Sequence, residues 1–252
     1  MEEFAKYILN EDDLVSKIEI IYFLAPKLGI NFDKTIVFKT EVTRMFLKYT
    51  KVKVDTNLVL TAALLCNCKK VDDAQKIGKL KTYAKEGAEH LAKLGFDERF
   101  CKICEGVNRY SGIKPREPES DILELVDSFG GMLIDRPERT AFNPDEAMVL
   151  LEHRNLKNEY NRYLESFRDF VEAMENVEIH GAVRTTVFAR LQKLMRESRT
   201  ITDFAKKIIL EYSPEVDQKL EELDGNEPKT KADANRALFS DESKEKILKH
   251  ID

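Results

Sequence analysis

The chain has 252 residues, a length that fits one large domain or one domain with an appendage. Its 42% hydrophobic and 35% charged residues, with only ten glycines and seven prolines, exclude collagen-like, low-complexity and wholly disordered chains. The net charge of −5 argues against a protein that grips nucleic acid or an anionic membrane with its whole surface. The four cysteines are too few for a disulfide framework, and no apolar run is long enough to cross a bilayer. These features predict a cytoplasmic, helix-rich globular protein without a membrane segment.

Apolar residues recur at spacings of three and four along most of the chain, whereas the strict alternation of a strand is rare, so we expect an all-α fold. The clearest helix start is at Asn143, an N-cap that is followed by Pro144 and, three residues on, by Glu146, the pattern of a capping box. The expected helices cover residues 2–9, 12–28, 34–49, 56–68, 72–94, 97–110, 119–134, 144–153, 156–175, 179–198, 201–211, 213–223 and 240–250.

The C-terminal part of the chain has an uneven charge. Basic residues outnumber acidic ones over 180–210 and the reverse holds over 211–252, so these two stretches are expected to pair within the molecule. The only linker-like stretch is 224–231, which is polar and contains both helix breakers, Gly225 and Pro228. We expect the residues beyond it to form a loosely attached, flexible acidic tail.

The sequence contains none of the common catalytic motifs. It has no P-loop, no H-E-x-x-H zinc motif, no G-x-S-x-G nucleophile elbow and no G-x-G-x-x-G. Its four histidines are far apart in the sequence, a spacing that does not indicate a metal pair. Each is expected at the surface or near a helix end: His90, His153, His180 and His250.

Four segments resemble, in the same order, the HD-GYP subfamily of the HD-domain phosphohydrolases, which hydrolyses cyclic di-GMP. Residues 62–70 (AALLCNCKK) are similar to the A-A-L-L-H-D-x-G-K signature, and residues 86–96 (EGAEHLAKLGF) to the segment G-A-E-x-L-x-x-L-G-F. Residues 126–139 (VDSFGGMLIDRPER) resemble V-A-D-x-F-D-A-L-x-x-D-R-P-Y-R, and residues 142–147 (FNPDEA) resemble L-S-P-E-E-A. The resemblance covers roughly residues 35–153 and implies an HD-domain-like helical bundle.

The resemblance also implies where the metal ligands of the family would stand, and this chain lacks most of them. Asp127 keeps the identity of an expected ligand, and Lys70 keeps that of a lysine which contacts substrate phosphate in the family. Other residues stand at the remaining ligand positions: Phe38, Cys66, Asn67, Tyr83, Gly106 and Val107. Together these eight residues form the expected remnant pocket.

A pair of bridging metal ions needs several imidazole and carboxylate ligands to replace its hydration shells, and one aspartate cannot supply them. We therefore expect no cofactor and no catalytic residue, and we interpret the chain as a pseudoenzyme. It would be a regulatory or scaffolding protein of bacterial signalling that binds protein partners. A second hypothesis makes it a nucleotide sensor or a residual phosphohydrolase with an altered site. Asp127, Lys70 and Arg136 either line a pocket for a phosphate-bearing ligand or have structural roles.

The cysteines form two short pairs, Cys66 with Cys68 and Cys101 with Cys104. In the fold that the resemblance implies, both pairs lie near the former metal pocket, and their thiolates are candidates for holding zinc or an iron–sulfur cluster. The alternative is that all four are small buried hydrophobic residues, as free cysteines commonly are. The spacing matches neither a zinc ribbon nor a ferredoxin, which favours this alternative.

The helix expected at 179–198 and the residue after it carry basic side chains at every third position, opposite the apolar face: Arg190, Lys193, Arg196 and Arg199. This is a candidate docking face for an acidic protein partner or for phosphates. The alternative is a solvated face that the acidic tail balances. No aromatic residues alternate with the basic ones, so nucleic acid is not an expected partner.

The expected organisation has three parts. An N-terminal helical extension covers residues 1–30, a degenerate HD-GYP-like domain covers 31–178, and a C-terminal helical extension with the acidic tail covers 179–252. Protein partners are expected to bind one of the two extensions.

Overall fold

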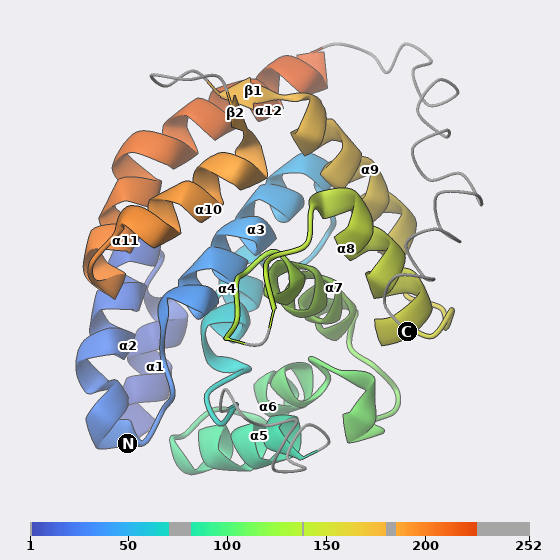
Figure 1. Ribbon diagram of the computed structural model, residues 1–252. Coiled ribbons are helices and arrows are strands. Elements are labelled where there is room, and N and C mark those ends of the chain that lie inside the picture. Colours follow the sequence, from blue (N-terminus) through green and yellow to red (C-terminus); the bar gives the residue numbers. More distant parts are fainter. Residues whose placement is uncertain (1, 71–81, 138, 180–184, 226–252) are drawn as a thin grey trace.

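The computed structural model describes residues 2–70, 82–137, 139–179 and 185–225 (Figure 1). Its helices are α1 (Glu2–Asn10), α2 (Leu14–Leu28), α3 (Lys34–Thr50), α4 (Thr56–Leu65), α5 (Tyr83–Lys93), α6 (Glu98–Glu105), α7 (Pro118–Met132), α8 (Pro144–Leu150), α9 (Leu164–Asn176), α10 (Val187–Glu197), α11 (Ile201–Lys207) and α12 (Ser213–Gly225). Outside the described residues lie the helix expected at 240–250, the first part of the one expected at 72–94, His180, His250 and nearly all of the expected tail. None of the described helices combines the length and the apolarity that a membrane span requires.

Three short turns and two short strands complete the described part. The turn η2 (Arg109–Ser111) is a 3₁₀ turn, and η3 (Leu151–Asn155) and η4 (Ile208–Tyr212) are π-helical turns. The strands β1 (Glu178–Ile179) and β2 (Thr185–Thr186) pair antiparallel. The all-α fold class expected from the sequence is therefore confirmed, with one two-residue strand pair added.

Local capping signals placed several helix starts correctly. At α8 the side chain of Asn143 accepts a hydrogen bond from the backbone N of Glu146 at 2.8 Å, and the Glu146 side chain accepts one from the backbone N of Asn143 at 3.1 Å. The expected capping box is thus formed. Aspartates cap α2, α3, α4 and α6 in the same way, each accepting from a backbone N–H of the first turn.

Two expected helix starts are wrong. The helix expected at 156–175 begins only at Leu164, because Lys157 and Asn158 adopt φ angles of 52° and 58°, which a right-handed helix cannot contain. The helix expected at 179–198 begins at Val187, after the strand pair, with Thr186 as its N-cap. In the first case apolar spacing continues through residues 156–163, whose backbone is not helical.

Helix α3 runs through the middle of the molecule. It packs against α4, α7, α9, α10, α11 and α12, and nearly every side chain from Ile36 to Leu47 is buried. Two threonines in this stretch donate their hydroxyls to carbonyls one turn earlier, Thr40 to Ile36 O and Thr43 to Lys39 O, both at 2.9 Å. Because α3 is surrounded, it can bring side chains of several helices together (Figure 1).

Phenylalanines from four helices form one aromatic cluster beside α3. The ring of Phe46 in α3 lies 5.1 Å from Phe167 and 5.5 Å from Phe170, both in α9. Phe129 in α7 lies 5.3 Å from Phe167 and 5.4 Å from Phe188 in α10. Most of these pairs meet edge to face, which adds to the stabilisation from burial. The cluster therefore holds α3, α7, α9 and α10 in fixed positions.

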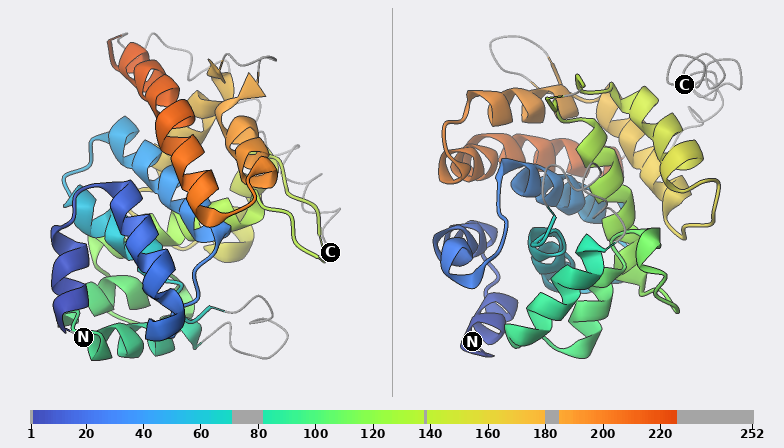
Figure 2. Two further views of the ribbon diagram at one scale, coloured as in Figure 1. Left: turned by 90° about the vertical axis from the view of Figure 1, so that its left-hand side faces the viewer. Right: turned by 60° about the horizontal axis from the view of Figure 1, so that its bottom comes forward.

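The C-terminal helices pack on one end of the molecule, opposite α5 and α6 (Figure 2). Arg44 of α3 pairs with Asp217 of α12 at 2.8 Å, and Lys48 pairs with Glu221 at 3.1 Å. These two carboxylates of the acidic stretch 211–252 therefore pair with α3 and not, as was expected from the sequence, with the basic stretch 180–210. Leu220 of α12 is buried in the same core as the N-terminal helices.

Candidate functional site

The structure brings part of the expected remnant pocket together around Asp127 of α7. One Asp127 carboxylate oxygen accepts from Asn67 Nδ2 at 2.6 Å, and the other pairs with Lys70 Nζ at 2.8 Å. A third residue, Lys39 of α3, places its Nζ 2.7 Å from the oxygen that Asn67 also contacts. We call these four residues the Asp127 cluster: Lys39, Asn67, Lys70 and Asp127.

The Asp127 cluster has an electrostatic character opposite to that of a metal site. Burial opposes ionisation of Asp127, but Lys39 and Lys70 outweigh it and hold the pKa of the carboxyl well below its usual range. The carboxylate therefore stays ionised, and both of its oxygens face ammonium groups. Two cations share one anion, so the cluster carries surplus positive charge where a metal site would need negative ligands.

Three other residues of the expected remnant pocket are buried and carry no charge: Phe38, Tyr83 and Val107. Phe38 and Val107 are fully buried in the hydrophobic core. Tyr83 is also buried, and its ring lies 5.0 Å from Lys70 Nζ, within range of a cation–π contact. Burial and the nearby Asp127 raise the pKa of Tyr83 well above its ordinary value, so its hydroxyl keeps its proton.

Sequence reasoning missed Lys39. It is the residue after Phe38, and it looks like one more polar position of an amphipathic helix. What makes room for it is a pair of glycines on α7: a Cβ atom at Gly130 would lie 2.9 Å from Lys39 Cγ, and one at Gly131 would lie 3.8 Å from Lys39 Nζ. The combination of a lysine in a buried helix with facing glycines was the available signal.

Gly106, which the resemblance places at a ligand position, lies in a close contact between α6 and α7. A Cβ atom at Gly106 would lie 2.6 Å from Ser120 Cβ, closer than side-chain atoms approach in proteins. Ser120 cannot easily turn away, because its hydroxyl donates to Ile103 O at 3.0 Å and the residue is fully buried. In this packing a histidine side chain has no space at position 106.

The substitution Gly106→Ala should therefore lower the free energy of unfolding by about 1–3 kcal/mol, the usual cost of overpacking a core. Urea denaturation followed by circular dichroism measures it. The matched control is Gly87→Ala in α5, where the nearest atom to the new Cβ is Cys68 Sγ at 3.4 Å. It should change stability by less than about 1 kcal/mol, since alanine also favours the helix. Equal effects of the two substitutions would contradict the packing argument.

All four cysteines are buried and are free thiols. Three of them lie within hydrogen-bonding range of a carbonyl at 3.8 Å: Cys66 with Ala63, Cys68 with Gly87, and Cys101 with Phe96. Burial raises the pKa of Cys68 to about 12 and that of Cys101 to about 11, and it raises the pKa values of Cys66 and Cys104 well above the ordinary value of a thiol. Across the residues that the structure describes, no three histidine, cysteine or acidic side chains are gathered so as to hold a metal ion.

We expect the native thiols to react with Ellman's reagent at pH 8 at least about a hundredfold more slowly than an exposed cysteine, because almost none is thiolate. In urea all four should react. Cys101 is the least buried of the four and should be the first to react in the native protein. A rapid native reaction of two or more thiols, or their protection by added zinc, would instead support the cysteine metal site.

The segment after α7 gives Arg136 and its neighbours different roles. Arg139 donates to Gly131 O at 2.8 Å and to Met132 O at 3.0 Å, and so closes the turn against α7. Asp135 accepts from the backbone N of Ala141 at 2.8 Å. Arg136 is exposed, and its Nη2 would lie 3.4 Å from a Cβ atom at Gly131. The same Cβ atom would lie 3.8 Å from Lys39 Nζ, so Arg136 and the Asp127 cluster approach Gly131 from the same side.

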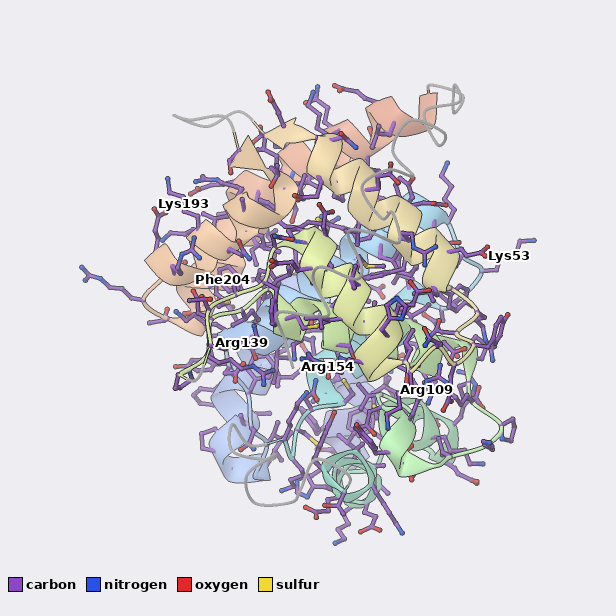
Figure 3. All side chains as sticks on the ribbon, turned by 45° about the vertical axis from the view of Figure 1, so that its right-hand side comes forward. Lys53, Arg109, Arg139, Arg154, Lys193 and Phe204 are labelled. Carbon is purple, nitrogen blue, oxygen red and sulfur yellow. The ribbon has the colours of Figure 1, made fainter. Side chains whose placement is uncertain are left out.

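The basic residues of α10 and Arg199, two residues beyond it, make no ion pair with Asp127 in the described part of the chain. Lys193 pairs with Glu197 at 3.7 Å, and Arg196 reaches Asp135 at 3.8 Å. Both basic side chains remain about half exposed, at 52% and 56%. Figure 3 shows Lys193 on α10, Arg139 in the segment after α7 and Arg154 in η3 following one another across one side of the molecule.

The geometry can be compared with known proteins. No family model, no curated protein and no solved structure matches this chain.

Proposed function

We propose that this chain is a non-catalytic, HD-GYP-like module that regulates or scaffolds bacterial signalling by binding protein partners. One observation carries the proposal: the two ammonium groups of Lys39 and Lys70 lie 2.7 and 2.8 Å from the two oxygens of Asp127. A metal ion at Asp127 would have to displace a lysine and would then lie against the other positive charge. Phe38, Val107 and Gly106, which the resemblance places at ligand positions, have no side-chain lone pair with which to hold it.

The arrangement also supports a stable scaffold without catalysis. The charges of the Asp127 cluster tie α3, α7 and the end of α4 together, and the cluster lies beside the aromatic core. A hydrolase would need an activated water molecule at this place, and neither an ion-paired aspartate nor a protonated tyrosine is suited to take its proton. The residues at the ligand positions that the resemblance implies are therefore suited to packing and not to hydrolysis.

The test is a paired measurement of metal content and turnover. Protein purified anaerobically and then incubated with Mn²⁺, Fe²⁺ or Mg²⁺ is analysed for bound metal and assayed with cyclic di-GMP and with bis(p-nitrophenyl) phosphate. We expect less than stoichiometric metal and no turnover above that of Asp127→Asn. Turnover that a chelator abolishes and that Asp127→Asn lacks would refute the proposal and support a residual phosphohydrolase.

A second candidate function, a nucleotide sensor, is favoured by the surplus positive charge of the Asp127 cluster. Lys39 and Lys70 share one carboxylate, and Arg136 lies on the same side of Gly131 as Lys39. A phosphate-bearing ligand could use this surplus. Calorimetric titration with cyclic di-GMP and with GMP tests it. Asp127→Asn should tighten such binding, because the substitution removes the competing anion, whereas Lys70→Met should weaken it.

A further inference from the structure

Cations from three segments that are far apart in the sequence lie near the contact between α10 and the segment that follows α7. Gln192 of α10 donates to Leu133 O at 2.7 Å and so fixes α10 against the segment that follows α7. The contact between Arg196 and Asp135 lies beside it. Arg154 of η3 reaches the end of α7, where its Nη2 lies 3.5 Å from Met132 Sδ, and its pKa is lowered by burial and by the nearby Arg136. We call the following set the cationic face: Arg136, Arg154, Arg190, Lys193, Arg196 and Arg199.

The residues that the structure describes neutralise the cationic face only poorly. Its two ion pairs, at 3.7 and 3.8 Å, are longer than hydrogen bonds and join side chains that are about half exposed. Arg136, Arg154 and Arg190 make no ion pair with any residue that the structure describes, whereas Arg199 lies near Asp203, which accepts a hydrogen bond from its backbone N at 3.1 Å. By contrast, Arg116 and Arg162 pair with Asp121 at 2.8 and 2.7 Å. The face therefore differs from the molecule's other arginine clusters.

The charge of this face is the reverse of that of the whole chain. The protein has a net charge of −5, yet this face sets six cations against three nearby carboxylates of described residues, those of Asp135, Glu197 and Asp203. Five of the six are arginines, whose planar guanidinium groups bind carboxylates through two parallel hydrogen bonds. Such a face attracts an acidic partner and repels a second basic one, which sets both the rate and the specificity of association.

A protein partner fits these features better than nucleic acid. Binding of a single strand usually combines phosphate contacts with aromatic side chains on which bases stack. No large hydrophobic side chain of α10 is exposed, so α10 offers no stacking platform. The negative charge of the rest of the chain also opposes a long polyanion but not a short acidic segment.

We infer that the cationic face binds an acidic segment, rich in aspartate and glutamate, of a protein partner. This inference rests on the proposed function, because it names the chemistry of the partner that the non-catalytic module would recognise. It assigns the binding to a face made by α10 together with Arg136 and Arg154, across the boundary between the expected domain and its C-terminal extension.

The experiment measures fluorescence anisotropy of a labelled decaglutamate peptide titrated with the full chain at low salt. Wild type should bind with an affinity that falls as salt rises. The triple variant Arg190→Gln, Lys193→Gln, Arg196→Gln should bind about tenfold more weakly or worse. The double variant Arg136→Gln, Arg154→Gln should weaken binding in the same direction, and it keeps the test decisive if the triple variant does not fold.

The matched control removes three exposed lysines elsewhere, Lys53, Lys85 and Lys93, each replaced by glutamine. Lys53 and Lys193 project from opposite sides in Figure 3. The control should bind decaglutamate within about twofold of wild type, since it loses the same charge from another place. A labelled oligothymidine of ten nucleotides is titrated in parallel and should bind more weakly than decaglutamate.

Three results would overturn the inference. These are no binding of decaglutamate, an equal loss in the control and in the triple variant, and tighter binding of oligothymidine, which would identify a nucleic-acid interface. None of them depends on the Asp127 cluster. The metal and turnover assays above therefore separate failure of the proposed function from failure of this inference. If turnover is absent and decaglutamate does not bind, only the inference of an acidic partner is refuted, and the proposed function stands.

Discussion

Replacing Asp127 with alanine is expected to lower the free energy of unfolding by about 3–5 kcal/mol, the cost of leaving buried charges without a partner. Lys39 and Asp127 expose only 9% and 10% of their side chains, so neither can turn into solvent without repacking. The substitution leaves two ammonium groups facing each other across a cavity. Urea denaturation of wild type and variant measures the difference.

A second substitution separates the charge effect from the cavity. Adding Lys39→Met to Asp127→Ala removes one of the unpaired cations, so the double variant should recover part of the lost stability. If the effect came from the cavity alone, removal of the lysine charge would recover nothing. The same double variant tests whether Lys39, which sequence reasoning missed, belongs to the cluster energetically.

The loss of stability caused by Asp127→Ala should become smaller as the pH falls. The pKa of Asp127 is lower in the folded chain than in the unfolded one, so its contribution is complete above the unfolded value of about 4 and is lost as the pH falls below it. The stability difference between wild type and variant should therefore be constant from pH 6 to pH 8 and should shrink toward pH 2. A difference that grows in acid would contradict the ion-pair assignment.

Replacing Arg116 with alanine is expected to cost about 3–5 kcal/mol, because it leaves two buried carboxylates with fewer partners. Arg116 pairs with Asp121 at 2.8 Å and with Glu124 at 3.2 Å, and it donates to Gly106 O at 2.9 Å. Burial already raises the pKa of Glu124, although Arg116 and Arg109 oppose the shift. Without Arg116 the ionised carboxylates become costly, so the variant should come closer to wild type as the pH falls toward 4.

Two comparisons test the Arg116 argument. Arg116→Lys keeps the charge but not the planar group that reaches several acceptors at once, so it should lie between wild type and alanine. Lys102→Ala removes a cation whose ion pair with Glu98 is exposed, and it should leave the stability nearly unchanged. If Arg116→Ala is as mild as Lys102→Ala, the network around α7 does not stabilise the fold.

Local signals in the sequence were enough to place many of the helices. The aspartate caps, the capping box at Asn143 and the apolar spacing act between neighbouring residues, so their physical effect is visible in the chain itself. The failure at 156–163 has a local cause as well, but a weaker signal. Positive φ angles at Lys157 and Asn158 are uncommon for these residue types and leave the apolar spacing intact.

The Asp127 cluster could be predicted only in part from signals between neighbouring residues. Asn67, Lys70 and Asp127 were expected to lie close together, and they do, but the partner that controls their charge, Lys39, comes from another helix. Its place depends on how closely α3 approaches the glycines of α7, a distance set by the packing of both helices against the core. The cationic face likewise joins α10 to Arg136 and Arg154, segments far apart in the chain, because pairing of charges across helices depends on distance in space and not on separation in sequence.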